Sequence, residues 1–104
     1  MIRGGLVRLS VAELDRAVRF YIETLGLKLV SETEESAVID CGDGFQLVLA
    51  KAPPGEHRGA VAVGLHPKMP LAEAIAILEN RGVTFDASQE FYDPDGNVVY
   101  LLTG

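Results

Sequence analysis

The chain repeats one series of apolar residues, glycines and turns twice in the same order. The matching landmarks, given as first copy and second copy, are Leu14 and Leu71, Ala17 and Ala74, Val18 and Ile75, Gly26 and Gly82, and Gly44 and Gly96. The first three pairs lie 57 positions apart, the fourth 56 and the fifth 52. An ordered repeat of this kind predicts two copies of one structural unit in tandem.

Each half contains one segment with the 3.6-residue period of an amphipathic helix. Apolar positions 14, 17, 18, 21 and 25 form one stripe in the first half, and Gly26 follows where a left-handed cap is common. Positions 71, 74, 75 and 78 form the stripe of the second half, after Pro70 and before Gly82. We predict helices over about 14–25 and 71–81.

The other segments alternate apolar and polar residues with the period of a strand, so that Val7, Leu9 and Val11 share one face. The strands that we predict cover about 6–11, 27–30, 37–39, 45–49, 60–65, 83–85, a segment ending at Tyr92, and 98–102. This order predicts an α+β chain of two tandem βαβββ modules, at about 3–51 and 60–103. A linker at 52–59 joins them within one domain, 1–104.

Length and charge limit the classes of protein to which the chain could belong. The 104 residues suit one domain, and the net charge of −6 with nine Lys and Arg argues against a nucleic-acid partner. Cys41 is the only cysteine, which excludes a disulfide within the chain and a cysteine-rich metal site. No apolar run reaches the ~18 residues of a membrane span and no signal peptide is visible, so we expect a cytoplasmic protein without a membrane partner.

Two stretches resemble the vicinal oxygen chelate superfamily, which includes glyoxalase I, extradiol dioxygenases, fosfomycin-resistance enzymes and bleomycin-resistance proteins. The sequence LSVAELDRAVRFY at 9–21, followed by LGL at 25–27, is similar to the superfamily's opening segment. The sequence FYDPDGN at 91–97 is similar to its closing turn. The resemblance implies that the two modules form a curved mixed sheet around a shared cleft, with the helices outside.

Enzymes of this superfamily usually hold one divalent metal in the cleft, through His and Glu from the first and last strands of each module. The resemblance places these positions on Leu6 and Val48 in the first module. In the second it places them on Tyr100 and on either Ala62 or Val63, of which the strand alternation favours Ala62. None is a standard metal ligand. We therefore predict neither a metal nor another cofactor.

The resemblance also defines the residues expected to line the cleft. The predicted ligand-binding residues are Leu6, Arg8, Gln46, Val48, Ala62, His66, Val98 and Tyr100. A guanidinium facing an apolar cavity needs a partner, so Arg8 should meet an anionic ligand or an acid of this chain or of a second subunit. The other histidine, His57, lies in the linker and is expected to be exposed.

These expectations favour metal-independent binding of a small molecule by a homodimer, in the manner of the bleomycin-type resistance proteins that bind antibiotics. One alternative is an enzyme, a glyoxalase, isomerase or dioxygenase relative. A metal-free enzyme could use Tyr100 or His66 as acid or base, but we assign no catalytic residue. A third alternative is an interaction protein with a closed cleft, which the short hairpin between Phe85 and Tyr92 favours.

Overall fold

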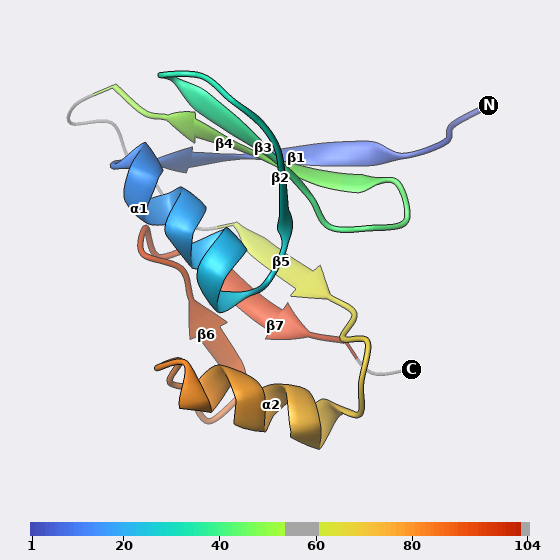
Figure 1. Ribbon diagram of the computed structural model, residues 1–104. Coiled ribbons are helices and arrows are strands. Elements are labelled where there is room, and N and C mark those ends of the chain that lie inside the picture. Colours follow the sequence, from blue (N-terminus) through green and yellow to red (C-terminus); the bar gives the residue numbers. More distant parts are fainter. Residues whose placement is uncertain (54–60, 103–104) are drawn as a thin grey trace.

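The computed structural model describes residues 1–53 and 61–102 (Figure 1). Most of the predicted linker at 52–59, with His57, lies outside the described residues, as do Ala60 and residue 103 at the predicted ends of the second module. The elements are β1 (Gly5–Val11), α1 (Leu14–Arg19), the π-helical turn η1 (Phe20–Thr24), β2 (Lys28–Glu32), β3 (Ser36–Asp40), β4 (Phe45–Lys51), β5 (Ala62–Leu65), α2 (Leu71–Asn80), β6 (Glu90–Tyr92) and β7 (Val98–Leu101). No helix within the described residues is long and apolar enough to cross a membrane.

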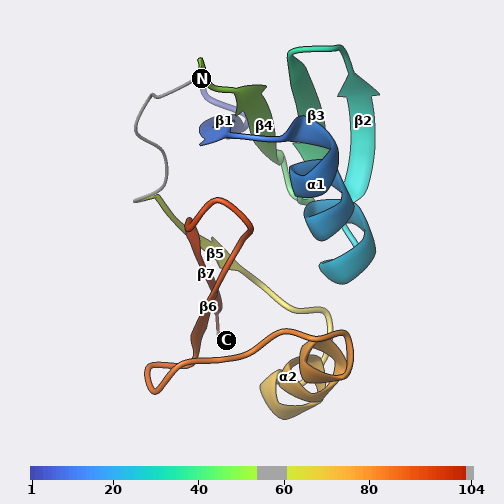
Figure 2. The same ribbon diagram turned by 90° about the vertical axis from the view of Figure 1, so that its left-hand side faces the viewer.

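The strands form two sheets, one in each half of the chain. Sheet A has the order β1-β4-β3-β2 and sheet B has the order β5-β7-β6. The first and last strands of each half run parallel, β1 with β4 and β5 with β7, whereas the other pairs are antiparallel. The α+β class and the mixed character of the sheets are thus confirmed. Figure 2 shows α1 next to sheet A and α2 next to sheet B.

The strand predicted at 83–85 does not form, so sheet B has three strands. The Val83 N–H donates to the Leu78 carbonyl at 3.0 Å and so serves the end of α2 rather than a strand ladder. Phe85 packs by its side chain instead, with its ring 5.1 Å from that of Phe91. Alternation alone predicted this strand, but the Val83 N–H is used by the end of α2 and none of the described strands pairs with the segment.

The first helix also differs from the predicted single α-helix over 14–25. Its α-helical part ends at Arg19 and continues as η1, where the Leu25 N–H donates to the Phe20 carbonyl five residues earlier at 3.1 Å. The wider turn ends at Gly26, whose φ of +74° is the left-handed conformation predicted for the cap.

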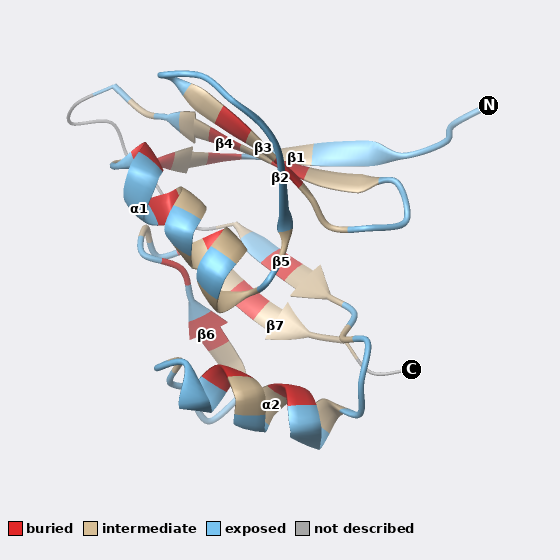
Figure 3. Ribbon diagram, viewed as in Figure 1, coloured by how far each residue is buried: buried red, intermediate tan, exposed pale blue. Residues whose placement is uncertain are grey.

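Buried and less buried residues alternate along β1, β3, β4 and β7 (Figure 3). The buried residues define the core face of each sheet, and the alternate residues define its open face. On sheet A the buried positions include Leu9, Leu47 and Leu49, each 0% exposed, and they pack against α1. On sheet B Phe91 and Val99 are buried in a second cluster with Leu78 of α2. Three partly buried residues touch both clusters and join the two halves, namely Phe20, Leu25 and Leu65.

Candidate functional site

The predicted site residues lie on the faces of the two sheets that turn away from the core, which we call the open faces. Across β1 and β4, Leu6 pairs with Gln46 and Arg8 pairs with Val48. Because paired residues of parallel strands point to the same side, these four side chains form one patch on sheet A. Its members range from partly buried to exposed, with Leu6 57% exposed.

Sheet B repeats this arrangement at equivalent positions. Ala62 pairs with Val98, and Gly64 pairs with Tyr100. Val63 is only 3% exposed and pairs with the fully buried Val99, so of the two candidate positions it is Ala62 that lies on the open face. Tyr100 lies two residues beyond the partner of Ala62 on the neighbouring strand, and Val48 lies two residues beyond the partner of Leu6. The diagonal from Ala62 to Tyr100 is therefore equivalent to the diagonal from Leu6 to Val48.

The Tyr100 ring lies across β5 and explains the glycine there. A Cβ atom added to Gly64 would lie 2.8 Å from two carbons of the Tyr100 ring and 3.0 Å from its hydroxyl oxygen. Real Cβ atoms do not approach other atoms this closely. The absence of a side chain at Gly64 is therefore what allows the phenol to lie flat on the open face.

Arg8 and Gln46 bring polar groups to the patch on sheet A. The Arg8 side chain is exposed and forms no ion pair with any described residue, and Gln46 is partly buried. Of the partners expected for Arg8, an acid within the described part of this chain is thus not found.

His66 lies apart from this group. It follows β5 and lines a cavity of about 310 Å³ that also contacts α2 and the turn after η1, on the helical side of the sheets. The structure therefore divides the predicted residues into three places: the open face of sheet A, the open face of sheet B, and this cavity. Within residues 1–53 and 61–102, no group of three or more His, Cys, Asp or Glu is placed to hold a metal ion.

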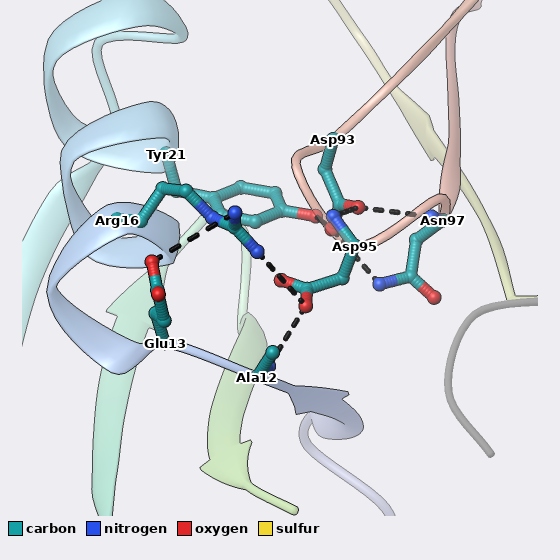
Figure 4. A network of polar contacts seen from close by, with 7 residues as sticks. All are labelled: Ala12, Glu13, Arg16, Tyr21, Asp93, Asp95 and Asn97. Atoms are coloured by element: carbon teal, nitrogen blue, oxygen red, sulfur yellow. Dashed lines mark hydrogen bonds and ion pairs between the residues drawn. The ribbon is translucent and has the colours of Figure 1, made fainter. Parts of the chain in front are cut away.

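A buried polar network, which the sequence did not predict, joins the two halves (Figure 4). The Tyr21 hydroxyl of η1 donates to Oδ2 of Asp93 in the turn before β7, at 2.6 Å. Asp93 Oδ1 accepts the backbone N–H groups of Asp95 and Asn97 at 2.8 and 2.9 Å, and Oδ2 accepts the Asn97 side-chain amide at 2.9 Å. The one signal for this network in the sequence was the hydroxyl of Tyr21 within an otherwise apolar helical stripe.

The same turn reaches the beginning of α1 through a second carboxylate. Asp95 Oδ1 accepts the Ala12 N–H at 2.7 Å and lies 3.6 Å from a guanidinium nitrogen of Arg16. Arg16 also lies 3.8 Å from Glu13. The Asp95 side chain is 1% exposed and that of Arg16 is 43% exposed, so the ion pair is buried on the Asp95 side and open to solvent on the Arg16 side. The two stretches that carry the sequence resemblance thus meet in space.

The surroundings of Tyr21 fix the protonation state of its hydroxyl. Burial, and then the negative charge of Asp93, raise the pKa of the Tyr21 hydroxyl above its ordinary value. The phenol therefore remains protonated and donates its hydrogen bond at all physiological pH values.

The comparisons with known proteins agree with this architecture. The profile of the Glyoxalase/Bleomycin resistance protein/Dioxygenase superfamily matches residues 5–101, and the chain belongs to this superfamily. A search of curated proteins gave no match.

Solved structures extend the likeness to almost the whole chain. TnmS3, an antibiotic-binding protein from Streptomyces sp. CB03234, is 26% identical, with a TM-score of 0.82 over 97% of this chain and 94% of its own. A glyoxalase/bleomycin resistance protein from the same organism is also 26% identical, with a TM-score of 0.79 over 96% and 99%. Lactoylglutathione lyase from Agrobacterium tumefaciens is 21% identical, with a TM-score of 0.72 over 92% and 89%, and shares the fold.

Proposed function

We propose that the protein binds a small organic molecule without a metal ion, on the open faces of its sheets. The observation that carries this proposal is the pair of equivalent diagonals, Leu6 to Val48 and Ala62 to Tyr100. The superfamily resemblance places the metal ligands of enzymes at these four positions. Here three are aliphatic side chains that offer no donor atom to a metal, which supports binding rather than metal-dependent catalysis.

The composition of the open faces suits a ligand that is mainly apolar with one or two polar groups. Leu6, Val48 and Val98 supply apolar surface, and Arg8 and Gln46 supply hydrogen-bond donors beside it. Small-molecule sites are commonly built from apolar walls with a few convergent polar groups. Because Arg8 has no acidic partner among the described residues, an anionic or strongly hydrogen-bonding group on the ligand would be favoured there.

The likeness to TnmS3 makes an antibiotic-like natural product the first ligand class to test. The TnmS3 structure is described as that of an antibiotic-binding protein, and it matches almost the full length of this chain. We extend this only as a proposal, with the cytoplasm as the expected place of action.

We further propose that two copies combine to complete the site. Within one chain the predicted residues lie on two separate sheets, and large apolar side chains stay exposed at Leu6 (57%) and Tyr92 (55%). A second copy could cover these surfaces and bring one sheet A opposite one sheet B. Light scattering should give twice the 11.2 kDa mass of one chain, and an 11.2 kDa species at working concentration would contradict the dimer.

The function is tested by thermal unfolding of EDTA-treated protein against a panel of natural-product antibiotics. A ligand at a hundredfold excess over its Kd adds ~2.7 kcal/mol to the unfolding free energy, which corresponds to a rise in Tm of at least ~10 °C for a domain of this size. If instead no compound raises the Tm in EDTA, while Zn²⁺ or Ni²⁺ does so in stoichiometric amount, the metal-dependent enzyme becomes the better account.

A further inference from the structure

A second cavity lies on the other side of the sheets from the proposed site. It has a volume of about 310 Å³ and is bounded by the turn after η1, the loop between β5 and α2, and one face of α2. Its walls are largely apolar, with Leu27 from the first half facing Ile77 and Leu78 from the second. Because both halves form its walls, the cavity exists only when they are packed together.

The charged residues that line this cavity are basic, and the charge of Asp40 acts on Cys41 from outside the lining. Lys68 and Arg81 line the cavity beside the imidazole of His66, and no Asp or Glu among the described residues does, although the chain has 15 acids against nine Lys and Arg. Neither Lys68 nor Arg81 forms an ion pair with a described residue. An apolar cavity with basic groups alone is thus found in a protein of net charge −6.

One of these cations is already held in position. The Nη1–H group of Arg81 donates a hydrogen bond to the Thr24 carbonyl of η1 at 2.8 Å. This bond fixes the guanidinium against the turn that forms one wall of the cavity. The remaining N–H groups of Arg81 have no hydrogen-bond partner among the described residues. A guanidinium held by one bond loses less side-chain entropy when it binds a further anion.

We propose that this cavity binds an amphipathic organic anion, namely a carboxylate with a medium-length apolar chain, for which decanoate serves as the test compound. The apolar body would lie among Leu27, Ile77 and Leu78, and the carboxylate would meet Lys68 and Arg81 at the rim. A volume of about 310 Å³ lies at the lower end of the ~300–1,000 Å³ typical of small-molecule sites, which favours a medium-chain acid over a long-chain one. This site is independent of the open faces, so either proposal can fail without the other.

Cys41 provides a direct measurement of occupancy. It is the only cysteine of the chain and it lines the cavity. A ligand in the cavity should therefore shield its thiol from alkylation by iodoacetamide, which can be followed by mass spectrometry at pH 8.5. The probes are decanoate, 1-decanol and decyltrimethylammonium, used below the concentrations at which they form micelles.

We expect decanoate to slow alkylation of Cys41 at least tenfold. Decanol and the cationic probe should protect the thiol only at much higher concentrations. Lys68→Gln and Arg81→Gln should each raise the decanoate concentration for half protection about tenfold, because each removes a charged contact. Lys51→Gln is the matched control, since Lys51 does not line this cavity. Both substituted side chains are exposed, so the variants should fold, which a cooperative thermal transition verifies; Lys68→Gln also keeps the bond between Arg81 and Thr24.

Three results would overturn the proposal. Decanoate could leave the alkylation rate unchanged, which would show that the cavity stays empty. The three probes could protect equally, which would show that the basic rim selects nothing. Protection could also survive in Lys68→Gln and Arg81→Gln as it does in Lys51→Gln, which would place the anion elsewhere.

Discussion

The Tyr21 hydroxyl donates a 2.6 Å hydrogen bond to the carboxylate of Asp93, a residue 72 positions further along the chain. Both side chains are buried, at 0% and 5% exposure. The same carboxylate accepts three further hydrogen bonds from Asp95 and Asn97. One carboxylate thus shapes the turn between β6 and β7 and fastens it to the first half of the chain.

Replacing Tyr21 by Phe removes one hydrogen bond to this buried carboxylate. We expect the unfolding free energy to fall by ~1.5–3 kcal/mol, the usual range for a hydrogen bond to a charged group. Urea denaturation measures the change. Tyr92→Phe is the control, because Tyr92 is 55% exposed, and it should change stability by less than ~0.5 kcal/mol. Equal stabilities of the two variants would show that the Tyr21–Asp93 bond does not hold the halves together.

The two faces of β1 should respond differently to truncation. Leu9→Ala removes a fully buried side chain from the core of sheet A and should cost ~2–5 kcal/mol of unfolding free energy. Leu6→Ala removes a side chain that is 57% exposed and should leave the stability of the isolated chain nearly unchanged. Urea unfolding of both variants, at concentrations where light scattering gives the mass of one chain, tests the assignment, and a large loss in Leu6→Ala under those conditions would contradict it.

Local patterns predicted most of the secondary structure, because short-range physics decides it. The stripe of 71–78, the glycine at 26 and the Asp-Gly turns each led to an element that the structure contains. The prediction of a strand at 83–85 was wrong because strand pairing depends on a partner that is distant in the sequence. Here the Val83 N–H instead bonds to the end of α2. The Tyr21–Asp93 bond escaped prediction for the same reason, since nothing near either residue in the sequence indicates the other.

The candidate site was predictable only as a set of strand positions. Alternation predicted that Leu6 shares a strand face with Arg8, and Val48 one with Gln46, since side-chain direction has period two. That these positions and Tyr100 line one ligand site was implied by the family resemblance and stays a prediction. The position of His66 depended on the loop after β5, and the structure places it in the other cavity. Loop geometry does not follow from alternation, which is why this residue separates from the rest.

The thiol of Cys41 should ionise at unusually high pH. Burial, and then the neighbouring charge of Asp40, raise its pKa from 9.0 to about 11. Only the thiolate reacts with alkylating agents, so the iodoacetamide rate should rise with pH to a midpoint near pH 11. Alkylation of the ligand-free protein across pH 8–12, followed by mass spectrometry, measures this midpoint. A midpoint at or below pH 9 would mean that the thiol is not shielded from water.

Gly64 should control the position of the Tyr100 ring. An added Cβ in Gly64→Ala would lie 2.8 Å from that ring, which must then leave its place on the open face. We expect Gly64→Ala to weaken binding of an antibiotic found in the screen about as much as Tyr100→Ala does. Gly5→Ala is a matched control in β1, since a Cβ there has nothing within 4 Å. If titration calorimetry finds the same Kd for Gly64→Ala and Gly5→Ala, the Tyr100 ring does not contact the ligand.

The central claim, metal-independent binding on the open faces, is tested most directly by calorimetric titration of that antibiotic into EDTA-treated wild type, Arg8→Ala and Tyr100→Phe. We predict a measurable Kd for the wild type in EDTA and a loss of roughly ten- to a hundredfold in Arg8→Ala, the equivalent of ~1.5–3 kcal/mol, with smaller losses in Tyr100→Phe. The Tm values of both variants without ligand should stay close to the wild-type value. Binding that appears only after a divalent metal is added, or an unchanged Kd in Arg8→Ala, would contradict the account.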